Sequence, residues 1–462
     1  MLTYTLSRES GRPLYEQLYA SIKNDILSGA IRGGEKLPSK RQLAEHLGVS
    51  KVTVETAYQQ LLAEGYVTVR EKVGFFAEQI TPVQPAGSLP PFRWDPLPEP
   101  GSSARQFPVS IWARLMRRVL LDRGEVLLQP LPGPGLPELR LAIAQELRRS
   151  RGMAVSPAQI LIGSGAEYFY NILIQLLGRE RRYGLESPGH QKIAAVCRAN
   201  QVSVAPITLD ESGVSMDALR KSGATVLHLS PSHQFPTGIV MPVRRRQELL
   251  SWVQEAPGRF LIEDDYDAEF RFSGLPIPTL QSLDRSGRVL YLNTFSRTIA
   301  PSLRISYLVL PPQLMEEYEC RLGFYSCTVP GTEQLTLSLF LSEGYFEKHL
   351  GRVRKHYGLL RSRLLKGLRD SSAGGCLQIF EEDAGLHFLL QVPPEINASA
   401  FCRTLSVGGL RVTPLTRYFV GPPEVGAERR FVVDYGNLED IPMVLSGLDT
   451  LLSGFLTGKS PK

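Results

Sequence analysis

Small hydroxyl groups and two arginines cluster between residues 291 and 307, a segment that predicts a strand, a polar turn and a second strand. Thr294 and Ser296 supply the hydroxyls, and Arg297 and Arg304 supply guanidinium groups. Both kinds of group donate hydrogen bonds to phosphate oxygens, so their position at the end of a strand suits a phosphate. The segment therefore predicts a phosphate pocket with a basic side chain at its centre.

Other loops that follow predicted strands also carry polar groups. In a mostly parallel sheet, ligands bind beyond the carboxyl ends of the strands. Ser164, Gly165 and Ala166 lie where a strand gives way to a helix, whose first backbone N–H groups favour an anion. The four carboxylates within 263–267 indicate either a metal site or, more commonly in such loops, helix caps and partners for a basic group. His233 predicts a structural hydrogen bond rather than a catalytic group.

The first 78 residues follow a different pattern, with apolar residues at helical spacing. Ser39, with Gln42 three residues later, is a capping-box signature, and Gly48 and Ser50 mark a tight turn and a second helix start. Two helices joined in this way make a helix-turn-helix, and the alternating segment 66–77 predicts a hairpin wing. We expect the second helix to face the first through Val54, Tyr58, Leu61 and Leu62.

Candidate DNA contacts lie at the starts of these two helices and in the wing. A recognition helix places its first residues at base edges or phosphates, and a helix N-terminus favours phosphate. The candidates are Lys40, Arg41, Ser50, Lys51, Thr53 and Gly74. The alternative is a plain helical subdomain with solvated charges, because acidic and basic residues nearly balance in this region.

Length and composition indicate a globular protein of two or three domains. The chain has 462 residues, of which 43% are hydrophobic and 21% charged, and its net charge of +6 permits nucleic-acid binding without requiring it. There is no apolar run long enough for a transmembrane helix and no signal-peptide pattern, so we expect no membrane contact and a cytoplasmic location. The five cysteines lack metal-ligand spacing and predict free thiols in the core.

Composition and periodicity divide the chain into three parts. Residues 1–78 form the helix-turn-helix with its wing. Prolines concentrate in 79–105 and predict a semi-extended linker. From 106 to 462, short buried strands alternate with helices, which predicts an α/β domain with a mostly parallel sheet and a smaller α+β part at its C-terminal end.

Several motifs resemble known families. The pattern Leu-Pro-Ser-x-Arg-x-Leu-Ala-x-x-Leu-Gly-Val-Ser-x-x-Thr-Val from residue 37 resembles the winged helix of GntR-type bacterial regulators. The larger part resembles fold type I aminotransferases, which bind pyridoxal 5′-phosphate (PLP). The motifs are Gly-Leu-Pro-Glu-Leu-Arg140, Ser-Gly-Ala-Glu167, Ser-His-Gln-Phe-Pro-Thr-Gly238, Glu-Asp-Asp-Tyr-Asp267, Thr-Phe-Ser-Arg-Thr-Ile-Ala-Pro301 and Ala-Gly-Leu-His387. Together the two parts resemble the MocR-type regulators.

The resemblance implies a role for each matching position. Asp264 would pair with the pyridine nitrogen of PLP, and Tyr266 would reach the ring hydroxyl. The implied phosphate site comprises Ser164, Gly165, Ala166, Ser296 and Arg304, with Thr294 beside it. Arg430 aligns with the arginine that binds the α-carboxylate of an amino acid, although a surface arginine is an equal alternative.

The sequence departs from this family at the position that carries the chemistry. Arg297 stands where the family has the lysine that forms a Schiff base with the cofactor aldehyde. Arginine stays protonated and forms no stable imine, so we expect no catalytic residue and at most non-covalent PLP. His190 stands at the position of the aromatic residue that stacks on the ring. Phe235 replaces the asparagine of an Asn-Pro-Thr-Gly loop, and 130–132 replace Tyr-Gly-Asp.

These features predict a regulator of transcription. We expect a homodimer that binds double-stranded operator DNA with repeated half-sites, and a large domain that senses a small-molecule effector without turnover. The effector would be PLP held non-covalently, a compound of PLP with an amino acid, or another anion. The alternatives are an aminotransferase fused to a DNA-binding domain, which Arg297 opposes, and a ligand-free dimerisation scaffold.

Overall fold

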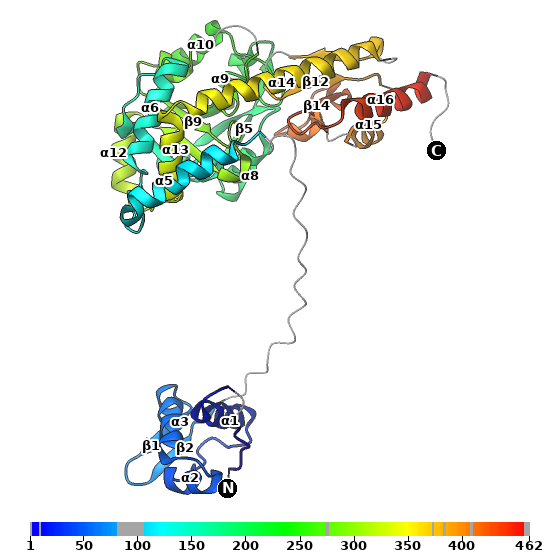
Figure 1. Cartoon of the computed structure of the whole chain (residues 1–462). Helices are drawn as coiled ribbons and strands as arrows, with labels where there is room; N and C mark the ends of the chain where they lie inside the picture. Colours follow the sequence, from blue (N-terminus) through cyan, green and yellow to red (C-terminus); the bar gives the residue numbers. More distant parts are fainter. Residues whose placement is uncertain are drawn as a thin grey trace. The chain divides into compact units, whose positions relative to one another are not determined.

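The computed structural model describes residues 2–8, 11–80, 106–272, 277–371, 374–381, 385–394, 396–406 and 410–456. The chain divides into two compact units, 1–97 and 98–462 (Figure 1). Apart from residues 79 and 80, the predicted linker lies outside the described residues. None of the helices in the described ranges combines the length and the apolar character that a membrane span requires.

The first unit contains three helices followed by a two-stranded antiparallel hairpin. The elements are α1 (Leu14–Ser28), α2 (Lys40–Leu47), α3 (Lys51–Ala63), β1 (Val67–Arg70) and β2 (Gly74–Ala77). Ser39 and Gln42 form the predicted capping box of α2, and the Ser50 side chain accepts the Thr53 N–H at the start of α3. These caps satisfy helix-end N–H groups that would otherwise lack partners. The unit is the predicted winged helix.

The core of the winged helix is apolar and tightly enclosed. Val54, Tyr58 and Leu61 of α3 are fully buried, as expected. The prediction for Leu62 is wrong, because its side chain is 40% exposed. Leu62 follows Leu61 directly, and one residue turns the side chain by about 100° around a helix, away from the packed face.

The second unit is built on an eight-stranded sheet in the order β3-β10-β9-β8-β7-β4-β5-β6. The strands are β3 (Ile160–Ser164), β4 (Arg182–Ser187), β5 (Ser203–Asp210), β6 (Gly213–Val214), β7 (Val226–Leu229), β8 (Phe260–Asp264), β9 (Val289–Thr294) and β10 (Ile305–Val309). Strands β9, β8, β7, β4 and β5 pair in parallel, whereas β10 is antiparallel to both neighbours and β6 to β5. The predicted mostly parallel α/β sheet is therefore confirmed.

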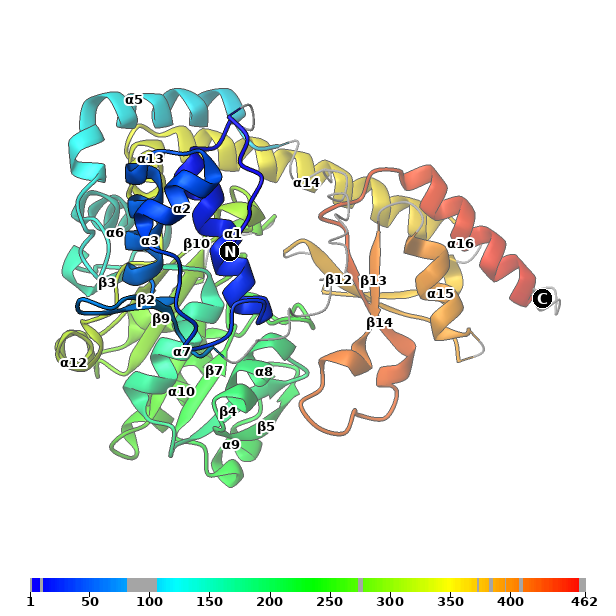
Figure 2. The ribbon, with the colours of Figure 1, turned by 90° about the horizontal axis from the view of Figure 1, so that it is seen from below.

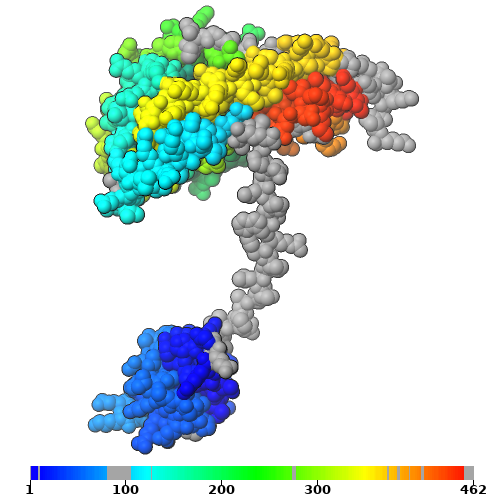
Figure 3. All heavy atoms as spheres, viewed as in Figure 1, coloured from blue at the N-terminus to red at the C-terminus, as the bar shows by residue number. Residues whose placement is uncertain are grey.

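Helices cover both faces of this sheet (Figures 1 and 2). They are α5 (Val109–Leu127), α6 (Pro137–Arg151), α7 (Ala166–Leu177), α8 (Gln191–Ala199), α9 (Met216–Ser222), α10 (Val243–Gln254), α11 (Leu280–Leu283), α12 (Pro312–Leu322) and α13 (Gly331–Ser342). Helices α7, α8 and α12 share a core with one face, and α5, α6 and α13 share a core with the other. In space-filling view, α5 and the later helix α14 are exposed on the same face of the unit (Figure 3).

The long helix α14 (Tyr345–Asp370) leads from the large sheet to a smaller C-terminal part (Figure 2). Its sheet is antiparallel, in the order β11-β12-β14-β13. The elements are β11 (Gln378–Phe380), β12 (His387–Gln391), α15 (Ala398–Leu405), β13 (Arg411–Pro414), β14 (Arg430–Asp434) and α16 (Ile441–Leu456). The α+β expectation is confirmed, although β13 had not been recognised in the sequence.

All five cysteines are free, as predicted, but they do not all lie in the core. Cys197 is buried, Cys327 and Cys402 are partly buried, and Cys320 and Cys376 are exposed. The expectation of core thiols is therefore wrong for the last two residues.

Candidate functional site

A cavity of about 710 Å³ lies in the large unit, between the carboxyl ends of its parallel strands and the C-terminal sheet. This volume is that of a small-molecule site. The predicted ligand-binding residues that line it are Gly165, Ala166, His190, Asp264, Tyr266, Thr294, Ser296, Arg297 and Arg304. Ser164 and Arg430 are not part of the lining. The sheet brings these residues together because strands β8 and β9 end at the same edge.

One end of the cavity has the features of an anion cradle. Gly165, with φ of +91°, precedes α7, and a Cβ atom added there would lie 2.3 Å from Arg304 Nη2. Only glycine therefore lets the backbone approach the guanidinium so closely. Arg304 Nη2 donates to Glu167 Oε2 at 2.6 Å, so an incoming anion must compete with this carboxylate. Across the turn, Thr294 Oγ1 donates to Ser296 Oγ at 3.0 Å.

Ser164 lies just outside this cradle. Its backbone N–H donates to Thr328 Oγ1 at 2.8 Å, so that N–H group is not available to a ligand. Ala166 and Glu167, the first residues of α7, line the cavity instead of Ser164.

Asp264, at the end of β8, is a buried carboxylate held by two neighbours. The Tyr170 hydroxyl donates to its Oδ2 at 2.5 Å, and His228 Nε2 lies 3.4 Å from the same oxygen. Burial alone would raise the pKa of Asp264, but the hydrogen bonding and charge of His228 outweigh burial and lower it. Asp264 therefore presents a carboxylate, rather than a carboxylic acid, to the cavity.

Arg297 projects into the cavity from the turn after β9. Its side chain is 38% exposed, and Nη1 lies 3.9 Å from Asp434 Oδ2 at the end of β14. Burial opposes its charge, but the carboxylates of Asp434 and Asp267 outweigh this effect and raise the pKa of Arg297. A permanent cation thus lies in the cavity at the position that the resemblance assigns to the reactive lysine of the aminotransferases.

Aromatic rings form another wall. His190 stacks on Phe235, with ring centroids 4.3 Å apart and planes 14° apart, and Tyr266 lies edge-on to both. Burial lowers the pKa of His190 to about 4, so its imidazole is neutral at pH 7. His190 Nε2 is buried and has no hydrogen-bond partner among the described residues, which leaves a polar atom for a ligand or a water molecule.

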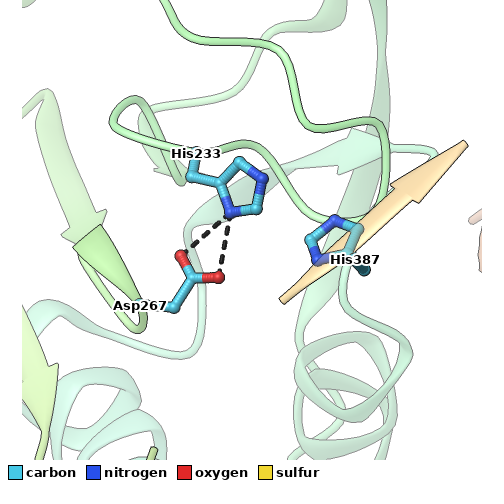
Figure 4. Close-up of side chains that lie close together, drawn as sticks. All are labelled: His233, Asp267 and His387. Carbon is cyan, nitrogen blue, oxygen red and sulfur yellow. Dashed lines mark hydrogen bonds and ion pairs between the residues drawn. The ribbon is translucent and has the colours of Figure 1, made fainter. Parts of the chain in front are cut away.

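A buried histidine cluster lies next to this wall. His233 Nδ1 lies 2.9 Å from Asp267 Oδ2, and His387 is beside them (Figure 4). A Cβ atom at Gly385 would lie 1.9 Å from His233 Cε1, which explains the glycine two residues before His387. The contact of His233 is the structural hydrogen bond expected from the sequence. Burial, with the nearby charges, holds the pKa of His387 well below its usual value.

The acidic run after β8 does not converge on a single ion. Glu263 accepts the N–H groups of Leu280 and Gln281 at the start of α11, and thus acts as a cap. Asp265 binds Arg151 and accepts the Tyr291 hydroxyl. Glu263 and Asp265 therefore have separate partners, as expected for caps and ion-pair partners. Asp267 lies instead with His233 and His387, and the potential ligand atoms of these three residues are within 4.8 Å of one another.

Arg430 is the first residue of β14 and is exposed. Its Nε donates to Gln391 Oε1 at 3.1 Å, on the neighbouring strand. The structure thus favours the surface alternative for Arg430. Arg411, which pairs with Asp434 in the register of β13 and β14, is the arginine of this sheet that lines the cavity.

Several residues around the cavity were not anticipated as site residues, among them Tyr170, His228, Arg411 and Asp434. Asp434 follows the apolar run 431–433, and a polar residue at a strand end was the signal used for Asp264. Tyr170 and His228 lie within apolar stretches, and nothing in their local sequence distinguishes them from core residues.

The cavity fits PLP in two respects and not in a third. Asp264 is ionised and suits a protonated ring nitrogen, and the cradle at Gly165 and Arg304 suits a phosphate. No amine is present at position 297 to bond the aldehyde. Lys192 also lines the cavity, but its side chain is 81% exposed and its Nζ lies 3.2 Å from Glu167 Oε1. Position 297 therefore offers a phosphorylated ring non-covalent contacts only.

The candidate DNA-contacting residues of the winged helix differ in their exposure and in their partners within the protein. Arg41 Nε donates to Glu45 Oε1 at 2.9 Å within α2, and its side chain remains 84% exposed. Lys40 Nζ donates to Glu55 Oε1 at 2.5 Å, which joins α2 to α3. Ser50 and Thr53 share a hydrogen bond at the start of α3, and Lys51 beside them is exposed. Gly74 begins β2 with φ of +133°.

Sequence and structure comparisons agree with this division. The profile of bacterial regulatory proteins, gntR family, matches residues 14–77, and the profile of aminotransferase class I and II matches residues 102–428. The HTH-type transcriptional regulator YhdI of Bacillus subtilis is 36% identical, over 97% of this chain and 98% of its own. The probable rhizopine catabolism regulatory protein MocR of Rhizobium meliloti is 32% identical, over 98% and 96%.

A third relative is the HTH-type pyridoxine biosynthesis transcriptional regulator PdxR of Corynebacterium glutamicum, which is 31% identical over 92% of both chains. Among solved structures, an archaeal alanine:glyoxylate aminotransferase has a TM-score of 0.67 at 20% identity, over 76% of this chain and 88% of its own. LysN, the α-aminoadipate aminotransferase of Thermus thermophilus, solved with N-(5′-phosphopyridoxyl)-L-leucine, has a TM-score of 0.64 at 25% identity, over 77% and 91%.

The chain belongs to the MocR-type transcriptional regulators, in which a GntR-type winged helix precedes an aminotransferase-like domain. It is a DNA-binding regulator of transcription, as the sequence predicted. Its second unit has the aminotransferase fold.

Proposed function

We propose that the large domain senses a small anionic molecule without turning it over. The ligand would be PLP or a PLP-like or amino-acid compound, held non-covalently. In an aminotransferase, PLP joined to a lysine supplies an electron sink for carbanion chemistry. The proposal rests above all on Arg297, a guanidinium inside a cavity that otherwise retains Asp264 and the Arg304 cradle.

In this proposal the residues of the chain only bind and orient the ligand. The cradle at Gly165, Ser296 and Arg304 holds a phosphate, Asp264 accepts a hydrogen bond from a ring nitrogen, and Tyr266 reaches a ring hydroxyl. The relative PdxR, named for pyridoxine biosynthesis, supports a ligand of this chemical class.

We also propose a role for each part of the chain. Residues 1–78 would bind the operator, 79–105 would connect the domains, and 106–462 would sense the ligand and form a homodimer in the cytoplasm. Exposed apolar side chains on α5, among them Leu120 and Leu121 at 53% and 75%, support an interface between two chains. A dimer presents two winged helices and thus requires repeated half-sites.

The test is a spectrum and a melting curve of the full chain with PLP. We expect PLP to raise the melting temperature, as a ligand of the native state does. We expect no covalent adduct after borohydride treatment. An adduct within the cavity would favour the aminotransferase alternative, and no shift with PLP, related phosphates or amino acids would favour the scaffold. Sedimentation velocity measures the dimer.

A further inference from the structure

The guanidinium of Arg297 has unused hydrogen-bond donors. Its nearest carboxylate oxygen, Asp434 Oδ2, is 3.9 Å away, beyond hydrogen-bond distance. Across the described part of the chain, no side chain or carbonyl accepts a hydrogen bond from it. Arg304, in contrast, donates to Glu167 at 2.6 Å. Arg304 is therefore already paired through a hydrogen bond, whereas Arg297 has only the longer contact with Asp434.

The position of Arg297 tells which part of a ligand it would meet. In the family the residue at this position bonds the aldehyde carbon of PLP, so the guanidinium faces the ring substituent that PLP carries as an aldehyde. An arginine repels a substituent that is an ammonium, because both are cations. Its planar fork of donors matches the two oxygens of a carboxylate.

We propose that the cavity selects a phosphorylated pyridine whose substituent facing Arg297 is a carboxylate, in preference to the aldehyde or the amine. This inference rests on the proposed function, since it names the oxidation state of the ligand for the same site. Three recognition elements act together: the Arg304 cradle on the phosphate, Asp264 on the ring nitrogen and Arg297 on the carboxylate.

Asp434 offers a further test of the proposal, because its carboxylate competes with a ligand carboxylate for Arg297. Its Oδ1 accepts the Gly436 N–H at 2.9 Å, and its Oδ2 faces the guanidinium. A ligand carboxylate would displace this weak attraction. Asp434→Asn keeps an oxygen for Gly436 and removes the competing charge, so it should strengthen carboxylate binding several-fold.

The experiment measures binding to the full-length protein by calorimetry with four probes. These are PLP, pyridoxamine 5′-phosphate, 4-pyridoxate 5′-phosphate and inorganic phosphate. We expect the wild type to prefer the carboxylate over the amine by about tenfold to a hundredfold, the value of a charge-assisted bidentate contact. Arg297→Gln should remove this preference. Arg148→Gln, on the exposed side of α6, should retain it.

Arg297→Lys provides a second readout that does not depend on affinity. The lysine amine condenses with the PLP aldehyde, one water leaves, and borohydride reduces the resulting C=N bond. Mass spectrometry should then locate a phosphopyridoxyl group on residue 297 of the variant and not of the wild type. An unmodified variant that melts like the wild type would show that residue 297 does not face the aldehyde, which overturns the proposal.

The outcomes separate this inference from the proposed function. Equal or tighter binding of the amine, unchanged in Arg297→Gln, would overturn the carboxylate preference while leaving ligand sensing intact. If none of the three phosphopyridoxyl probes binds and amino acids do not bind either, the proposed function itself fails.

Discussion

The winged helix and the cavity of the large domain place their polar groups in opposite ways. In the winged helix, polar side chains cap helix ends or face solvent, and the core is apolar. Around the cavity, carboxylates and imidazoles such as Asp264, Asp267 and His387 are buried. Burying such groups costs stability unless they are paired.

The difference reflects two kinds of ligand. A winged helix binds a polyanion from its surface, so it needs exposed cations and a rigid body. A small-molecule site needs desolvated groups in fixed places, because electrostatic contacts are stronger away from water. The stability of the winged helix should therefore depend mainly on its packing and helix caps, and that of the large domain on pH and ligand.

The largest effect should come from the core of the winged helix. Leu61→Ala removes a fully buried side chain and should destabilise this domain by about 2–5 kcal/mol, with loss of DNA binding. Leu62→Ala, at a position 40% exposed, should have a much smaller effect. Scanning calorimetry of the full chain should show a lower melting temperature for the winged-helix transition of Leu61→Ala and no change in the other transition. Equal effects of the two variants would contradict the packing described.

The second effect is a pH dependence of the stability of the large domain. Burial raises the pKa of Glu186 to about 8, so the native state binds a proton that the unfolded chain releases near pH 4.5. The stability that this proton contributes is fully present below about pH 4.5 and is lost as pH rises through about 8. The free energy of unfolding should fall by at most about 1.4 kcal/mol per pH unit from this group. Glu186→Gln should reduce that slope in urea unfolding.

A residual slope of the same sign should remain in Glu186→Gln. Burial raises the pKa of Glu263 and Glu269 to about 7, so these groups also lose their stabilising proton as pH rises. Glu211→Gln, at an exposed position, is the control and should behave like the wild type. A slope that is unchanged in Glu186→Gln would show that this carboxyl group is ionised in the native state.

A third, smaller effect concerns the capping box of α2. Ser39→Ala leaves the Gln42 N–H without its acceptor and should cost the winged helix about 1 kcal/mol. Ser21→Ala removes only a bond to the Gln17 carbonyl within α1 and should change little. Chemical unfolding of the two variants measures the difference, and equal stability would argue against the cap.

The smallest effect should appear in DNA affinity. Arg41→Ala removes an exposed cation and should weaken binding of non-specific double-stranded DNA by about 3- to 10-fold, with a salt slope lower by about 1. Lys40→Ala breaks the ion pair with Glu55, so part of its effect should appear as lower stability. Fluorescence anisotropy over a range of salt concentrations checks both; an unchanged slope for Arg41→Ala would remove it from the interface.

Local patterns were enough to predict much of this protein. Helix caps such as Ser39 and Ser50, the turn glycines and the period of apolar residues depend on neighbours within a few positions, and the structure has them as expected. The strand-end rule likewise brought Asp264, Ser296 and Arg297 to one site, because parallel strands end at a common edge. The absence of lysine at position 297 is a property of the sequence alone.

Contacts between distant segments were decided only by the tertiary structure. The partners of the acidic run, the pairing of Arg411 with Asp434 and the contact of Tyr170 with Asp264 join residues 17 to 114 positions apart. No periodic pattern encodes such pairs, because they depend on how β13, β14 and α7 pack. For the same reason the sequence left Arg430 with a ligand role and a surface position as equal alternatives, whereas the fold placed Arg411 in the cavity. The sequence determined what residue 297 cannot do, and the packing around it determined which groups a ligand would meet.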